Sequence, residues 1–185
     1  MKPAQRLLLC LAALSSPAAL AAHAHVHGLA KLDVAVDGGQ LILHLDSPLE
    51  SLLGFEHPPY SAVQVKQAQA MVSKLHAAQA LFVPTPAAAC RLDGVEIESE
   101  ALAPSLLAGG TQAPVPPPRA GQQGEAHGDL DADFTFRCAR PDALHGMDVR
   151  LFQHFPRLHR VDVQMALPQG ESAARLDPAH TRLSW

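Results

Sequence analysis

Three histidines alternate with small apolar residues in the stretch AHAHVHG, which covers residues 22–28. Imidazole titrates near neutral pH and is a common metal ligand. In an extended chain, side chains two residues apart point to the same face, with their Cα atoms roughly 6.5–7 Å apart. His23, His25 and His27 would then share one face, where two imidazoles can converge on one ion. We predict that this row begins a metal site; the alternative is a solvated polar tail.

A second candidate ligand pair, Glu125 and His127, lies at the start of a later segment that resembles residues 25–36. The segment EAHGDLDADFTF, which starts at Glu125, resembles HVHGLAKLDVAV, which starts at His25. Internal similarity is typical of a duplicated unit, although a match this short also arises by chance. If the two related strands lie near each other, Glu125 and His127 approach His25 and His27. We therefore predict that both halves contribute ligands to one site.

Glu56 and His57, in the stretch GFEHPP, form a third candidate pair. Two prolines stiffen the chain after them, and the alternative is that they are ordinary polar residues at the entry to a helix. Imidazole and carboxylate ligands suit zinc, copper(II) and nickel. Copper(I) would favour thioether ligands, but the methionines beyond residue 22 lie in apolar stripes without a Met-x-x-Met grouping. We therefore predict a bound zinc ion, with copper as the alternative.

Alternating apolar residues predict the strands that must position these ligands. Residues 29–36 and 41–45 alternate on either side of the turn signal DGG, which indicates a β-hairpin. Residues 130–138, 147–151 and 161–167 alternate in the same way, so each is predicted to be a strand. Ser61 and Gln64 fit a capping box at the start of a helix. We expect an α+β fold in which two related antiparallel β-rich halves share one core, with the main helix near residues 61–80.

The two halves are expected to form one compact domain. Residues 22–108 make the first half, residues 109–124 a Pro/Gly-rich linker, and residues 125–185 the second half. Cys90 and Cys138 lie on either side of the linker. Two cysteines in an oxidising compartment usually pair, so we predict a disulfide between them. The alternative is a thiolate metal site, which the lack of a CxxC pair disfavours.

Residues 1–21 have the organisation of a signal peptide. A positive start precedes an apolar run at residues 7–14 that is too short to span a bilayer, and ALA at residues 19–21 fits a cleavage site. A lipoprotein anchored through Cys10 is the weaker alternative, because the bulky Leu9 precedes it. Cleavage would remove two of the 14 basic residues and none of the 18 acidic ones, so the formal net charge falls from −4 to −6. We expect a periplasmic protein that does not insert into the membrane or bind nucleic acid.

Several motifs, taken in order, resemble the ZrgA-type periplasmic zinc-binding proteins. They are H-x-H-G, DVAVDG, SPLESLLGFEHPP, a second His-Gly start, DFTFRC, LFQHFP and VDVQ, spread over about residues 25–185. The resemblance implies an accessory role in zinc acquisition beside an ATP-driven zinc importer and its solute-binding component, with no known catalytic activity. It places the opening motif on His25, His27 and Gly28, the middle motif on Phe55, Glu56 and His57, and the second start on His127.

One feature departs from that family pattern. Members often carry a long His/Asp-rich stretch before the second start, whereas this chain has TQAPVPPPRAGQQGEAHG, with one histidine. Metal binding must then depend on the folded site.

Two other classes of function compete with zinc binding. An enzyme is the first, because an open zinc site with Glu56 could activate water. The chain, however, has no H-E-x-x-H helix, G-x-S-x-G elbow or Gly-rich phosphate loop. A structural or adhesion module with incidental histidines is the second. We predict an exported, non-enzymatic zinc-binding protein.

Overall fold

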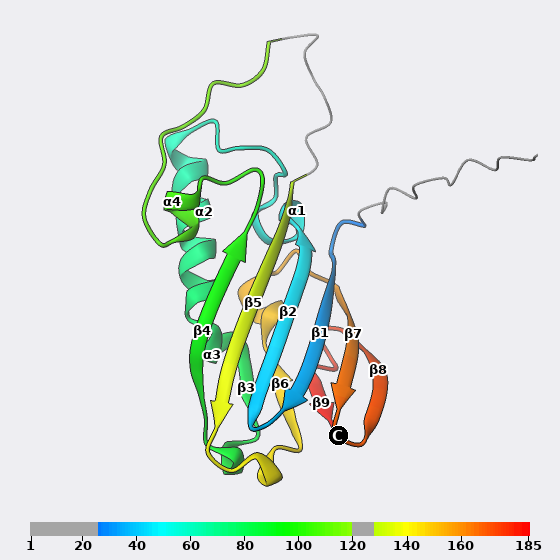
Figure 1. The fold of residues 1–185 in the computed structure, drawn as a ribbon. Coiled ribbons are helices and arrows are strands. Elements are labelled where there is room, and N and C mark those ends of the chain that lie inside the picture. Colours follow the sequence, from blue (N-terminus) through cyan, green and yellow to red (C-terminus); the bar gives the residue numbers. More distant parts are fainter. Residues whose placement is uncertain (1–25, 120–127) are drawn as a thin grey trace, which may run out of the picture.

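The computed structural model describes residues 26–119 and 128–185, and a six-stranded sheet dominates it (Figure 1). Its strand order is β4-β5-β2-β1-β7-β8, and a second sheet of order β3-β6-β9 lies behind it. The strands are β1 (Leu29–Asp37), β2 (Gln40–Pro48), β3 (Phe82–Pro84), β4 (Cys90–Glu98), β5 (Asp129–Cys138), β6 (Gly146–Val149), β7 (Arg160–Leu167), β8 (Gly170–Leu176) and β9 (Arg182–Ser184). The predicted signal peptide and the predicted ligands His23, His25, Glu125 and His127 lie outside the described residues.

The β1–β2 hairpin forms as its sequence predicts. Gly38 and Gly39 both have positive φ, 53° and 85°, which is the requirement of a type I′ turn and explains the two glycines. The even-numbered positions of β1 and the odd-numbered positions of β2 point into the core. The core side chains of this hairpin are Ala30, Leu32, Val34, Leu41, Leu43 and Leu45, none more than 2% exposed.

The predicted main helix is present but shorter than expected. It is α2, Ala62–His76, and a break at Ala77 separates it from α3, Ala78–Leu81. Ser61 caps α2 by accepting a hydrogen bond from the Gln64 N–H, as predicted. The Gln64 side chain accepts instead from the N–H of Tyr60, one residue earlier than in a capping box. The other helical segments are α1 (Leu49–Leu53), η1 (Pro86–Ala88), α4 (Pro104–Leu107), η2 (Pro141–Ala143) and α5 (Leu151–His154).

The fold is α+β, but the prediction of antiparallel pairing throughout is wrong. Strands β1 and β7 pair in parallel, so the large sheet is mixed. The expected relation between the halves is not shown: β1 and β2 form a hairpin in one sheet, whereas β5 and β6 lie in different sheets. Leu151, expected in a strand, begins α5. Alternation shows which face a strand buries, but it does not show the direction of its neighbour.

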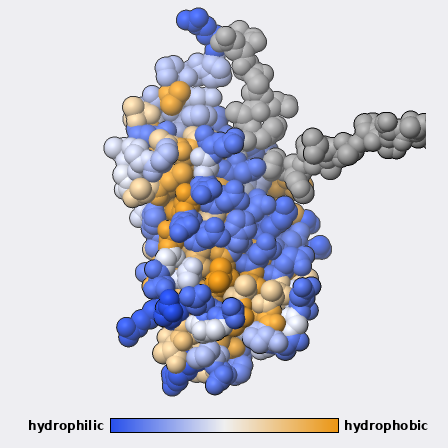
Figure 2. Space-filling view, viewed as in Figure 1, coloured by the Kyte–Doolittle hydropathy of each residue, from blue (hydrophilic) through white to orange (hydrophobic). Residues whose placement is uncertain are grey.

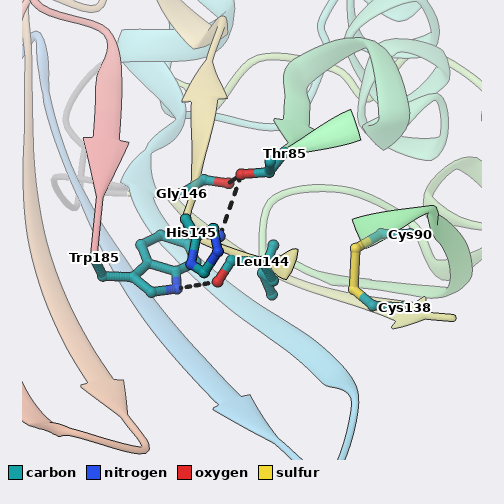
Figure 3. Close-up of a disulfide and its surroundings, with 7 residues drawn as sticks. All are labelled: Thr85, Cys90, Cys138, Leu144, His145, Gly146 and Trp185. Atoms are coloured by element: carbon teal, nitrogen blue, oxygen red, sulfur yellow. Dashed lines mark hydrogen bonds between the residues drawn. A yellow bond between two sulfur atoms is a disulfide. The ribbon is translucent and has the colours of Figure 1, made fainter. Parts of the chain in front are cut away.

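The predicted disulfide between Cys90 and Cys138 is present (Figure 3). The two cysteines face each other across β4 and β5, so the bond ties the segment before residue 109 to the segment after residue 124. The Asp93-Gly94 pair is a bulge in β4, where the register with β5 shifts, and the strand continues through it. Close by, the Trp185 indole donates to the Leu144 carbonyl at 3.1 Å and anchors the end of the chain (Figure 3).

The large sheet has one covered face and one open face. Its inner face, α2 and the small sheet share one hydrophobic core. The face turned to the viewer in Figure 2 is predominantly hydrophilic. Among the described residues, no helix has the length and apolar character that crossing a bilayer requires.

Candidate metal site

Strands β1 and β5 lie on either side of β2, and both begin at the end of the large sheet where β2 ends. Asp129, the first residue of β5, pairs with Pro48, the last residue of β2. Lys31 in β1 pairs with Asp46 on the other side. Because neighbouring strands lie about 4.8 Å apart, the starts of β1 and β5 are roughly 10 Å apart. We call this region, where α1 follows β2, the α1 end of the sheet (Figure 1).

Each strand is preceded by a glycine that packs closely against the α1 region. Gly28 donates its N–H to the buried Ser51 hydroxyl at 2.9 Å, and its φ of +78° is unfavourable for other residues. Gly128 accepts from the Leu49 N–H at 2.9 Å. A Cβ added to Gly128 would clash with the Glu56 carbonyl oxygen. The two glycines therefore bring both strand starts onto one short helix and its following loop.

His27 lies in a turn before β1 and not in the strand. The Leu29 N–H donates to the Val26 carbonyl at 3.1 Å and closes the turn. Since Gly28 has a left-handed backbone, the alternation that would align His27 with Lys31 on one strand face is interrupted. Strand alternation therefore does not set the direction of the His27 side chain, and His23 and His25, with which it was predicted to share a face, lie outside the described residues. The His27 side chain is 60% exposed, so His27 lies outside the core.

His27 and Glu56, both predicted ligands, come together at the α1 end. His27 Nε2 lies 3.0 Å from Glu56 Oε1, and the Glu56 side chain is only 15% exposed. Nitrogen and oxygen ligands of a tetrahedral zinc ion are about 3.3 Å apart, given metal–ligand distances near 2.0–2.1 Å. The pair is thus close to the spacing at which both atoms can share one ion.

His57 is held by its own loop and not by His27. Its Nδ1 donates to the Pro58 carbonyl at 2.8 Å. Its ring stacks on Tyr60 at 4.0 Å between centroids, with Phe55 at 5.0 Å. The hydrogen bond to a carbonyl selects the tautomer whose Nε2 carries the lone pair, as in many ligating histidines. His57 is therefore oriented, but it makes no contact here that joins it to the His27–Glu56 pair.

The described residues do not by themselves form a metal site. Within residues 26–119 and 128–185, no group of three or more His, Cys, Asp or Glu side chains is arranged to hold a metal ion. Structural zinc sites usually have four ligands, so His27 and Glu56 need further partners. The remaining predicted ligands, apart from His57, fall in the segments that the structure does not describe.

Another histidine–carboxylate cluster, on the open face of the sheet, was not predicted from the sequence. His44 Nδ1 donates to Asp133 at 2.9 Å, and its Nε2 lies 3.7 Å from Asp131. The two ring nitrogens thus face two different carboxylates, so these contacts form ion pairs and do not converge on one ion. The outward position of His44 in the alternating pattern of β2 was the available signal.

Charge crowding on this face perturbs two pKa values. Burial acts to lower the pKa of His44, but the hydrogen bond and charge of Asp133 and the charges of Asp131 and Asp33 outweigh it and raise this pKa. Burial, followed by the charge of Asp46, raises the pKa of Asp131. Both shifts favour the protonated forms of these side chains in the folded protein.

Comparison with known families gives one match that spans most of the chain. Residues 24–185 match the family described as ZrgA family zinc uptake protein. No curated protein matched the chain. The matched range includes both glycines, the His27–Glu56 pair and the disulfide.

Proposed function

The chain belongs to the ZrgA family of zinc uptake proteins, and from this premise we propose that it binds zinc at the α1 end of its sheet. The observation that carries the proposal is the His27–Glu56 pair, with 3.0 Å between Nε2 and Oε1. Both residues belong to motifs that the sequence singled out as ligating. Zinc is here the cargo of an uptake process, and the family description names no catalysed reaction.

The further ligands that we propose are His25 and His127, with His23, Glu125 and His57 as additional candidates. His127 directly precedes Gly128, whose backbone packs against Glu56. Consecutive Cα atoms are 3.8 Å apart across a trans peptide, so His127 is joined to a residue already at the site. His25 lies two residues before His27 and has a similarly short tether. These connections support convergence of both His-Gly segments on one ion.

We further propose that the protein acts in the periplasm as an accessory factor beside an ATP-driven zinc importer. The disulfide supports an oxidising compartment, because such bonds are rare in the cytosol. The resemblance of residues 1–21 to a signal peptide supports export. An accessory zinc binder would raise the local zinc supply to the importer without turnover of its own.

Zinc titration calorimetry on matched variants tests the proposed site. His27→Ala and Glu56→Gln each remove a proposed ligand, so zinc affinity should fall at least tenfold. Loss of a residue that only contacts a ligand already lowers metal affinity by about 10–100-fold. His44→Ala is the control, because His44 is also an exposed histidine paired to a carboxylate, at 2.9 Å. It should bind zinc like the parent. A parent chain that binds no zinc, or a His44→Ala loss as large as that of His27→Ala, would contradict the assignment.

A further inference from the structure

The geometry points to Glu50 as a positioning residue for the zinc site, acting through the imidazole of His27. This inference rests on the proposed function, because it concerns the same site. Glu50 is not one of the residues that the sequence motifs marked as ligands. Its role follows from its position beside Nδ1 of His27, whereas Glu56 lies beside Nε2.

The His27 ring lies between two carboxylates. Its Nε2 is 3.0 Å from Glu56 Oε1, and its Nδ1 is 4.0 Å from Glu50 Oε2. Glu50 therefore faces the ring nitrogen that would not bind an ion held between Nε2 and Glu56. Glu50 can instead accept a hydrogen bond from Nδ1–H after a small rotation of the exposed His27 side chain.

Glu50 thereby selects the tautomer that zinc requires. A neutral imidazole carries one proton, and the metal must take the nitrogen that lacks it. Without metal, the short contact places the proton on Nε2, directed at Glu56. When zinc occupies that position, the proton must reside on Nδ1, where the Glu50 carboxylate accepts it. A carboxylate behind a ligating histidine is a recurrent arrangement in zinc sites.

Arg157 binds one oxygen of the Glu50 carboxylate, and the other oxygen faces His27. Arg157 Nη1 donates to Glu50 Oε1 at 3.3 Å, which leaves Oε2 toward His27. The Glu50 side chain is 22% exposed, compared with 60% for His27. Gly54, at the end of α1, makes room for the guanidinium: an added Cβ would lie 2.8 Å from Arg157 Nε. Arg157 therefore positions Glu50, and Glu50 positions His27.

Two substitutions at Glu50 separate this role from a structural one. In Glu50→Gln, Arg157 holds the amide oxygen and directs the NH₂ group at His27 Nδ1. A donor at that position favours the opposite tautomer, with the proton on Nε2. We expect Glu50→Gln to weaken zinc binding by about 10–100-fold, at least as much as Glu50→Ala. A purely structural role predicts the reverse order, since glutamine keeps the shape and the Arg157 contact.

The experiment is zinc titration of the full chain and of Glu50→Gln, Glu50→Ala and Glu171→Gln, with melting temperatures recorded for each. Glu171→Gln, an exposed change on β8, is the control and should match the parent. In parallel, ¹⁵N NMR of the zinc-loaded parent should show His27 with Nδ1 protonated and Nε2 coordinated. Coordination through Nδ1 in that spectrum would reject the role of Glu50 even if a variant fails to fold.

Two results would overturn the inference and spare the proposed function. One is zinc affinity of Glu50→Gln within twofold of the parent while His27→Ala still loses binding. The other is a loaded His27 coordinated through Nδ1. A parent that binds no zinc would instead reject the proposed function itself.

Discussion

At the scale of single residues, His27 and His44 make the same kind of contact in different surroundings. Each donates to one carboxylate, at 3.0 Å and 2.9 Å. His44 is fixed on a central strand of the sheet with acidic neighbours on both sides. His27 lies in a turn, two residues after His25 in the sequence, and Gly128, which follows His127, packs against the same loop. The first environment raises the pKa of the imidazole and favours its protonated form, whereas the second is the one in which we propose zinc binding.

The raised pKa of His44 predicts a pH-dependent contribution to stability. A histidine whose pKa is higher in the folded than in the unfolded state stabilises fully below the unfolded value of about 6.5. The contribution disappears as pH rises through the folded pKa. The stability difference between the parent and His44→Gln should therefore shrink between about pH 5.5 and pH 8. Because the His44 side chain is 40% exposed, we expect only a few tenths of a kcal/mol.

Urea unfolding of both proteins at the two pH values, without zinc, measures this difference. A difference that stays constant, or grows with pH, would show that the acids facing His44, namely Asp133, Asp131 and Asp33, do not favour its charged form. Zinc binding should follow the opposite trend, because protons compete with the metal for imidazole at acid pH. The two pH effects can therefore be separated in one series of measurements.

At the scale of elements, Gly128 links the start of β5 to the loop that carries Glu56. Gly128→Ala should displace that loop, because its Cβ would clash with the Glu56 carbonyl and lie 3.0 Å from Leu49 Cδ1. We expect a loss of about 1–3 kcal/mol of stability, as for overpacked sites, together with weaker zinc binding.

Gly94→Ala provides the matched control for that substitution. A Cβ at Gly94 meets nothing within 4 Å, so both stability and zinc affinity should remain close to those of the parent. Denaturant unfolding and zinc titration of the two variants check the prediction. Parent-like behaviour of Gly128→Ala would show that the β5 start and the Glu56 loop are not tightly coupled.

The elements differ in how well the sequence predicts them. The β1–β2 hairpin and the start of α2 were predictable, because alternation, paired glycines and a serine cap are local signals. The parallel pairing of β1 with β7 was not, since it depends on contacts between segments far apart in the chain. The turn at His27 was missed for a different reason: residues 22–28 were treated as an extended chain, although a glycine such as that at position 28 often marks a left-handed backbone.

The candidate site was predictable to a similar degree. The sequence motifs pointed to His27 and Glu56, and the fold brings these two residues together. Glu50 falls within the motif SPLESLLGFEHPP but was not marked as a ligand, because its relation to His27 exists only once α1 and the turn are packed. His57 was grouped with Glu56 by adjacency, but its ring engages its own loop. Adjacent residues in such a loop need not face the same way.

At the scale of the whole molecule, the disulfide and the proposed zinc site lie at opposite ends of β5. Asp129 begins this strand at the α1 end, and Cys138 ends it, roughly 30 Å away at about 3.4 Å per residue. The bond stabilises the fold where the two segments of the chain meet, and the proposed zinc site lies at the other end. The two features should therefore be energetically independent.

Removal of the disulfide tests this independence. The double variant Cys90→Ala, Cys138→Ala opens a link between residues 48 positions apart, which the chain-entropy estimate values at about 4 kcal/mol. The free energy of unfolding should fall by that order while the zinc affinity of the folded variant remains unchanged. A parallel loss of zinc affinity would show that the two ends of the sheet are coupled.

The central claim is that zinc binds at the α1 end of the sheet, and anomalous X-ray scattering at the zinc edge from crystals of the zinc-loaded chain tests it most directly. We predict an anomalous peak about 2.0–2.1 Å from His27 Nε2 and within bonding distance of a Glu56 carboxylate oxygen, with histidine nitrogens of the His-Gly segments completing the coordination. A peak beside His44 on the open face of the sheet, or no peak near His27 in a zinc-loaded crystal, would contradict the claim.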